Sequence, residues 1–203
     1  MALPRLGMRL GVSHHLGWAV VVTARDDHSV IDRRRIELIE PGLPVAPIHH
    51  EGGAHEMHRT GPPLDDDELQ TLVSQVRALA VRATATAFDE LAAIVSEPIV
   101  SISLRAWPDD FPNDIAVLRK VPYESRADSV MYLQVMAELA RDHGWRVSFY
   151  DAKTVETEAA RALGARADEV LHGPRKILGP PWSKDHRVAL AATVVDGLSG
   201  EGS

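Results

Sequence analysis

Three β-branched segments lie within the first forty residues, and the connections between them are too short to hold a helix. The pattern predicts strands at residues 8–13, 18–24 and 30–39. The middle one, Trp-Ala-Val-Val-Val-Thr-Ala, lies between Gly17 and a polar turn at residues 25–29. Strands joined by short connections pair antiparallel, so we expect the chain to begin with a three-stranded meander.

The rest of the chain alternates helical and strand patterns. Acidic residues at 65–68 favour the N-terminus of a helix, and the apolar spacing after them fits one long helix or two short ones. A nearly uncharged segment at 99–104 predicts a buried strand. The further elements that we expect are a helix at 125–143, a strand at 146–150, and helices at 155–163 and 185–198.

Composition narrows the class of protein. The chain has 203 residues, a formal net charge of −7 and no cysteine. These numbers favour one domain over residues 1–198 with a short tail at 199–203, and they exclude disulfides and thiolate metal sites. No apolar run approaches the roughly 18 to 20 residues of a membrane span, so we expect a cytoplasmic protein without a membrane partner.

Basic residues form two clusters despite the acidic net charge. The first is residues 33–35, and the second comprises Arg175, Lys176, Lys184 and Arg187. Such clusters are more often solvated surface than binding sites, but a local basic patch for nucleic acid stays open.

A long segment at residues 41–63 is rich in Pro, Gly and His and has no apolar periodicity, which predicts a flexible loop. Within it, residues 49–58 hold four histidines and two glutamates, all competent metal ligands. The glycines equally favour a mobile loop whose histidines face water. A third interpretation is that only His50 and Glu51 fold back to the sheet.

The order of elements resembles the ribonuclease-H-like superfamily. The resemblance implies an α/β, three-layer fold with a five-stranded mixed sheet and helices on both faces. Residues 10–15, Leu-Gly-Val-Ser-His-His, resemble the first strand of RuvC-type Holliday-junction resolvases, where a similar lead ends in the first catalytic aspartate. Residues 184–192, Lys-Asp-His-Arg-Val-Ala-Leu-Ala-Ala, resemble the start of their last helix.

The catalytic carboxylates of that family are largely missing here. Position by position, Ser13 replaces the first-strand aspartate, Asp185 keeps an acidic place on the last helix, and Val188 replaces its partner. The fourth-strand acid is expected at residues 104–106, which read Leu-Arg-Ala. Two-metal phosphodiester cleavage needs several carboxylates around cations roughly 4 Å apart, so the usual chemistry would need other ligands.

Other polar residues are expected at the same end of the sheet. In α/β sheets, ligands bind beyond the carboxyl ends of the strands where the strand order reverses, here between the first and fourth strands. We expect this end to gather Ser13, His14, His15, Arg105, Trp107, Asp151, Lys153, Asp185 and His186. The simpler interpretation makes His14 and His15 turn residues and Asp185 a favourable charge at a helix N-terminus.

The leading hypothesis is a nucleic-acid-associated, metal-dependent nuclease with a rebuilt site. Its catalytic residues would be Asp185, Asp151, Lys153 and His15, with Lys153 or Arg105 steadying phosphate. Its metal ligands would be Asp185, Asp151, His15 and Glu51, and the metal would be Mg, Mn or Zn. Without a GxGxxG or GxxxxGK[ST] loop, we expect no nucleotide cofactor. The competing hypothesis is a catalytically inactive binding or assembly module, with a homodimer left open.

Overall fold

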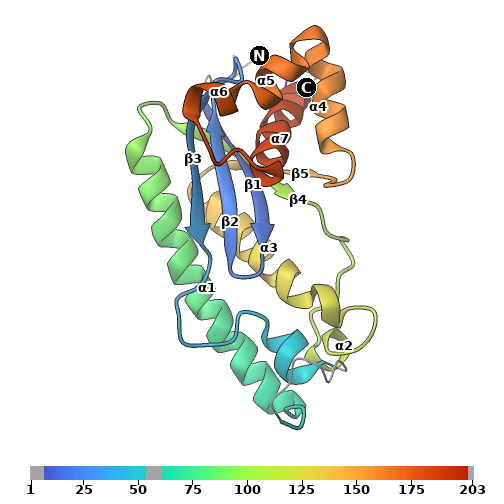
Figure 1. Ribbon diagram of the computed structural model, residues 1–203. Helices are drawn as coiled ribbons and strands as arrows, with labels where there is room; N and C mark the ends of the chain where they lie inside the picture. Colours follow the sequence, from blue (N-terminus) through green and yellow to red (C-terminus); the bar gives the residue numbers. More distant parts are fainter. Residues whose placement is uncertain (1–6, 54–60, 201–203) are drawn as a thin grey trace.

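A five-stranded mixed sheet forms the centre of the computed structural model, which describes residues 7–53 and 61–200 (Figure 1). The strands are β1 (Met8–His15), β2 (Trp18–Ala24), β3 (Val30–Glu37), β4 (Ile99–Arg105) and β5 (Arg146–Tyr150). Their order is β3-β2-β1-β4-β5, with β1 to β3 antiparallel and β4 and β5 parallel to β1. The predicted meander and mixed sheet are confirmed.

Helices cover both faces of this sheet, which confirms the predicted three layers. Helices α1 and α3 pack on one face, and α7 packs on the other against β1, β2 and β4, with α4 beside it (Figure 1). The helices are α1 (Asp66–Ile94), α2 (Ile115–Leu118), α3 (Glu124–Asp142), α4 (Val155–Leu163), α5 (Ala167–His172), α6 (Pro174–Leu178) and α7 (Lys184–Gly200), with short turns η1 (Ile48–Gly52) and η3 (Gly164–Arg166).

The hydrophobic core has two parts, one on each face of the sheet, because side chains alternate between the two faces along each strand. Leu10 and Val12 of β1 point into the cluster formed with α1 and α3, because successive side chains of a strand face opposite sides. Gly11 between them lies directly beneath α7, with no room for a side chain. The close approach of α7 to β1 therefore depends on this glycine.

A capping box begins α1 where the acidic run predicted a helix. The Asp65 carboxylate accepts the backbone N–H of Glu68 at 2.9 Å, and the Glu68 carboxylate accepts that of Asp65 at 3.3 Å. The helix then continues unbroken to Ile94, so the apolar spacing belongs to one long helix.

Three sequence expectations need correction. Strand β1 continues to His15, so His14 and His15 are strand residues rather than turn residues. Strand β3 ends at Glu37, two residues earlier than predicted. The loop at 41–63 contains the helical turn η1, whereas residues 54–60, with His55 and His58, lie outside the described residues.

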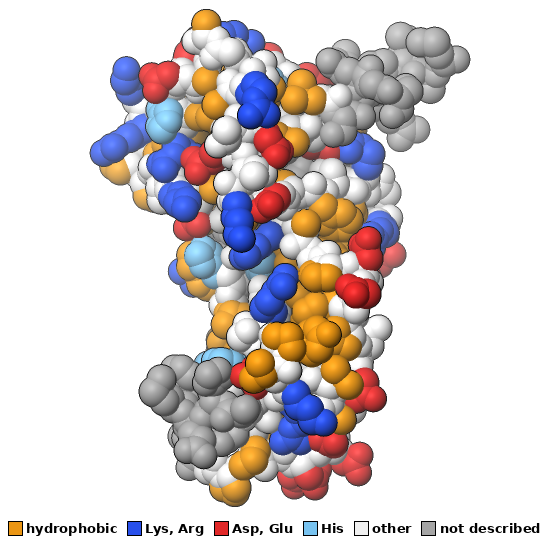
Figure 2. Space-filling model, turned by 90° about the vertical axis from the view of Figure 1, so that its right-hand side faces the viewer, with side chains coloured by type: hydrophobic (Ala, Val, Ile, Leu, Met, Phe, Trp, Pro, Cys, Tyr) orange, Lys and Arg blue, Asp and Glu red, His pale blue; other side chains and the backbone are white. Residues whose placement is uncertain are grey.

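Hydrophobic side chains gather at mid-height on the face of the molecule shown in Figure 2, on the side where β5 and the chain after β4 lie. On β5 itself, Phe149 is 47% exposed. Trp107 packs edge-on against Phe149, with ring centroids 5.0 Å apart. We call this surface the β5 face. Among the described residues, no helix combines the length and apolar character needed to cross a membrane.

Candidate functional site

Asp185 lies in the first turn of α7, where that helix meets the carboxyl end of β1. The hydroxyl of Ser13 donates to Asp185 Oδ1 at 3.0 Å, and His15 Nε2 lies 3.2 Å from the same oxygen. The side chains of His15 and Asp185 are 42% and 32% exposed, so water reaches both. Two of the four predicted metal ligands are therefore in contact.

A row of flat side chains crosses the sheet beside this cluster. The His15 ring stacks on the Trp18 indole with centroids 4.0 Å apart and planes 10° apart. The Arg35 guanidinium lies 4.2 Å from the centroid of the same indole and pairs with Glu37 at 2.8 Å. Stacking on Trp18 orients the His15 ring from one side, and cation–π attraction to Arg35 in turn orients Trp18. Asp185 contacts His15 from the other side.

Tyr150, at the end of β5, reaches β1 at the place where the strand order reverses. The pairing of β1 with β4 ends at Gly11 and Ser103, and the Tyr150 hydroxyl donates to the Val12 carbonyl oxygen at 2.7 Å. Burial raises the pKa of Tyr150 above its usual value, so the phenol stays protonated as a donor. Its position at the end of a strand was the only sequence signal for this residue.

Arg105 is the last residue of β4 and is exposed at the same point. Within the described ranges it has no ion-pair partner. Its positive charge helps to lower the pKa of His14 and opposes the rise in the pKa of Tyr150 that burial causes, which indicates that it lies close to both. An uncompensated cation therefore stands at the reversal point of the sheet.

His14 faces the opposite side of the sheet from Ser13 and contacts α3. Its Nε2 lies 2.8 Å from the hydroxyl of Ser129, while Nδ1 is buried without a hydrogen-bond partner among the described residues. Burial, and then the charge of Arg105, lower the pKa of His14 to about 4. Near neutral pH it is therefore an uncharged hydrogen-bonding group and a weak base.

Asp128, the neighbour of Ser129 on α3, anchors the first part of the histidine-rich loop. Its carboxylate is buried and accepts the backbone N–H groups of Ile48 at 3.1 Å and His49 at 2.9 Å. Burial raises the pKa of Asp128 to about 6. No local sequence pattern predicts this contact, because Ile48 and Asp128 are 80 residues apart.

Asp128 and His14 give opposite pH dependence to stability. Folded Asp128 takes up its proton near pH 6 and an unfolded aspartate near 3.8, so its contribution to stability falls as pH rises through that window. An unfolded His14 takes up its proton below 6.5 and the folded one only near 4, so its contribution falls as pH falls. Each effect reaches about 3 kcal/mol for a shift of about two pKa units.

Urea unfolding between pH 4 and 7 tests this pair. Relative to wild type, Asp128→Asn is expected to gain stability as pH rises, and His14→Gln is expected to gain stability as pH falls. The double variant serves as the control, because it lacks both contributions. Parallel stability curves for the two single variants would contradict the assignment.

Among the described residues, no hydrogen bond or ion pair joins Asp151, Lys153 or Glu51 to the Asp185 cluster. The Asp151 carboxylate accepts the backbone N–H of Lys153 at 2.8 Å and closes the turn before α4. Glu51 belongs to η1, which lies toward the opposite end of the molecule from α7 (Figure 1). The described part of the chain contains no group of three histidine or carboxylate side chains that could hold a metal ion.

His186 and Trp107 also have local roles. The His186 Nδ1 accepts the backbone N–H of Ser183 at 3.2 Å, and its ring packs near Trp182, so it caps the first turn of α7. Trp107 belongs to the β5 face. Among the described residues, neither side chain shares a hydrogen bond with Asp185.

The donor set at the reversal point does not fit a pair of metal ions. It offers one carboxylate, Asp185, together with the hydroxyls of Ser13 and Tyr150. Arg105, the last residue of β4, lies within residues 104–106, where the resemblance implies a further carboxylate. A guanidinium repels a divalent cation and attracts an oxyanion, so the chemistry of this end of the sheet fits an anionic ligand.

Comparisons with known proteins agree with the fold. No protein-family model matches the chain, and no curated protein matches its sequence. Its structure is similar to that of T. thermophilus RuvC in complex with a Holliday junction substrate, with a TM-score of 0.50, 14% identity, and coverage of 97% of this chain and 96% of that one. A second Thermus thermophilus RuvC structure gives a TM-score of 0.46 at 14% identity, covering 97% of each chain. The architecture of this chain is thus the ribonuclease-H-like fold, as the order of its elements predicted.

Proposed function

We propose that this chain is a nucleic-acid-binding protein of the ribonuclease-H-like fold that holds a backbone phosphate directly through Arg105. One observation carries the proposal: an exposed guanidinium without an ion-pair partner among the described residues lies where the strand order reverses. Ligands of open α/β folds bind at this point. A planar guanidinium recognises phosphate through two parallel hydrogen bonds.

The surroundings of Arg105 support an anionic ligand. Asp185 is the nearby carboxylate, and its Oδ1 already interacts with Ser13 and His15. His14 is an uncharged neighbour near neutral pH, because burial and the charge of Arg105 lower its pKa, so it adds no second cation or anion to the site.

The similarity to RuvC suggests the class of nucleic acid to test first. That protein was solved in complex with a Holliday junction substrate, so a four-way DNA junction is the first probe, beside linear duplex and single strand.

We retain two proposals from the sequence, namely one domain over residues 1–198 and a homodimer. The β5 face is the apolar surface that such a dimer would bury.

Fluorescence anisotropy with the labelled junction tests the proposal. Arg105→Ala is expected to weaken binding about tenfold and to reduce the slope of log affinity against log salt by about 1, because one phosphate contact is lost. Arg105→Lys should recover part of the affinity, since it restores the positive charge but not the two parallel N–H donors of the guanidinium. Arg141→Ala is the matched control, because Arg141 is exposed near the end of α3, which leads into the start of β5, whereas Arg105 pairs with Tyr150 at the end of β5. Equal affinities for wild type and Arg105→Ala would reject the proposal.

The same labelled junction tests the metal-dependent nuclease predicted from the sequence. Under our proposal the DNA stays intact with Mg²⁺ or Mn²⁺, since the donor set does not suit two cations. Cleavage by wild type that disappears in Asp185→Ala would restore the nuclease hypothesis and its ligands Asp185 and His15.

A further inference from the structure

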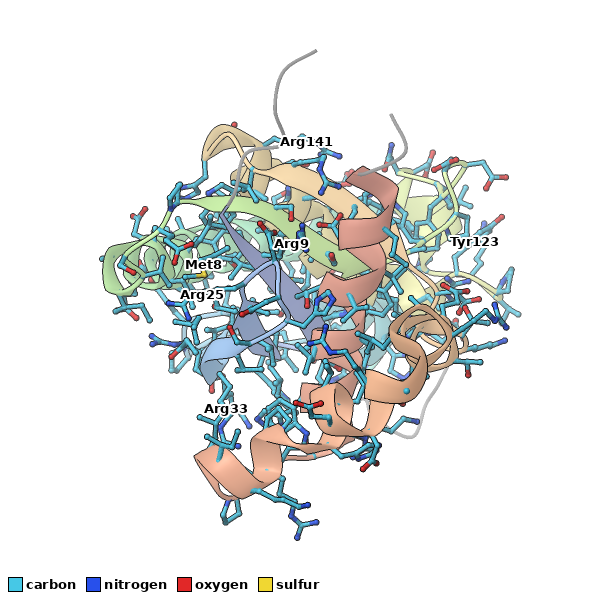
Figure 3. All side chains as sticks on the ribbon, turned by 90° about the horizontal axis from the view of Figure 1, so that it is seen from above. Met8, Arg9, Arg25, Arg33, Tyr123 and Arg141 are labelled. Atoms are coloured by element: carbon cyan, nitrogen blue, oxygen red, sulfur yellow. The ribbon has the colours of Figure 1, made fainter. Side chains whose placement is uncertain are left out.

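The two basic clusters of the sequence, far apart along the chain, lie side by side in the fold. The Arg33 guanidinium of β3 donates to backbone carbonyls at the end of α6 and in the linker after it. Its Nη2 lies 2.8 Å from the Leu178 oxygen and 3.4 Å from that of Pro180, and its Nη1 bonds the Pro181 oxygen. Figure 3 shows Arg33 beside the ribbon of α6. We call residues 174–184, which Arg33 anchors, the basic segment.

The basic segment keeps an uncompensated positive charge. Ion pairs neutralise the other members of the two clusters, with Arg34 bound to Asp32, Arg35 to Glu37, and Arg187 to Glu156. Arg33 contacts neutral carbonyl groups, so its own charge remains. Within the basic segment, Arg175, Lys176 and Lys184 are exposed and have no ion-pair partner among the described residues.

A large apolar side chain lies exposed among the basic residues of this segment. Ile177 of α6 is 85% exposed, the highest fraction among the exposed large hydrophobic residues that the structure describes. Leu178, the next residue, is 39% exposed, and Ile31, two residues before Arg33 on β3, is 37% exposed. Exposed apolar side chains that are grouped among polar residues are typical of interaction surfaces.

We propose that the basic segment is a second nucleic-acid contact, in which Arg175, Lys176 and Lys184 bind phosphates and Ile177 inserts at a base step. Proteins that distort DNA commonly combine these features, an apolar wedge with cations on either side. The inference rests on the proposed function and deepens it: the partner is a duplex that the protein opens or kinks next to the site of Arg105.

Continuity with the first site favours nucleic acid over a lipid surface. The linker from α6 crosses the sheet and enters α7 directly at Lys184, one residue before Asp185 (Figure 1). A polyanion on the basic segment therefore lies on a path toward the carboxyl end of β1. A membrane-binding surface needs a wide apolar face, whereas here one side chain projects far and two others only partly.

A duplex with 2-aminopurine beside a flexible TA step tests the wedge, because this base brightens when it unstacks. Wild-type protein is expected to raise the fluorescence severalfold, and Ile177→Ala should abolish most of the rise while retaining binding within about threefold. Val121→Ala is the matched control, since Val121 is 73% exposed on another surface. The double variant Arg175→Ala with Lys176→Ala should reduce the salt slope by about 2, as two phosphate contacts are lost.

The outcomes separate this inference from the proposed function. If Arg105→Ala weakens binding while the Ile177 and Arg175/Lys176 variants behave as wild type, the second contact is refuted and the first site stands. If only the basic-segment variants lose affinity, the second contact stands and Arg105 is refuted. Absence of nucleic-acid binding by wild type refutes both. Tight binding to vesicles of anionic phospholipid, lost in the Ile177 variant and without any 2-aminopurine response, also refutes the DNA wedge.

Discussion

Replacing Gly11 with alanine is expected to destabilise the protein by about 3 kcal/mol, or to prevent folding, because the new methyl group has no space. A Cβ at this position would lie 1.8 Å from the carbonyl oxygen of Ala189 and 3.0 Å from Thr193 Cγ2. The first of these atoms belongs to the backbone of α7, which cannot rotate away as a side chain could. The helix would have to shift off β1, carrying Asp185 away from Ser13 and His15.

Gly61→Ala provides the control for this substitution. A Cβ on Gly61 meets no atom of the described residues within 4 Å, and its backbone lies outside the left-handed region. We expect its free energy of unfolding in urea to stay within about 0.5 kcal/mol of wild type. Gly11→Ala with wild-type stability would show that α7 does not rest on β1 as described.

The second large effect is expected at Asp196, on the same helix. Its side chain is fully buried and binds Arg146 of β5 through both oxygens, at 2.5 and 2.9 Å. The Ser101 hydroxyl of β4 donates to it at 2.6 Å. Asp196→Ala leaves a cavity and a buried hydroxyl without its acceptor, so we expect a loss of about 3 kcal/mol.

A surface ion pair supplies the comparison for Asp196. Glu37 pairs with Arg35 at 2.8 Å, but its side chain is 63% exposed. Ion pairs exposed to solvent contribute little to stability, so Glu37→Gln should leave the free energy of unfolding nearly unchanged. If both substitutions cost the same small amount in urea unfolding, the Asp196 network does not hold α7 to β4 and β5.

The order of elements was predictable because each strong signal is local. The β-branched run before the turn at 25–29 specifies β2, and the acidic run at 65–68 specifies the start of α1 through a capping box. The short helices α2, α5 and α6 have too few residues to show an apolar period, so their existence depends on the packing around them.

The candidate site was predictable only in part, because its contacts join residues far apart in the chain. Asp185 and His15 were expected together from the topology, and they are in contact. Asp151 also follows a strand, yet it closes its own turn, since a carboxylate two residues before a free backbone N–H readily binds it. The reach of Tyr150 across β4 to Val12 follows from strand spacing, which the sequence does not display.

The central claim is that Arg105 binds a backbone phosphate without a metal ion. Its most direct test is the affinity of the protein for a four-way DNA junction, measured with and without divalent metal. Wild type and Arg105→Ala would be titrated in EDTA and in micromolar Mn²⁺ at equal ionic strength. If Arg105 takes the place of a metal ion, wild-type affinity is the same in both buffers within about twofold, and Arg105→Ala binds about tenfold more weakly in each. Binding that requires Mn²⁺ and is indifferent to Arg105 would contradict the account.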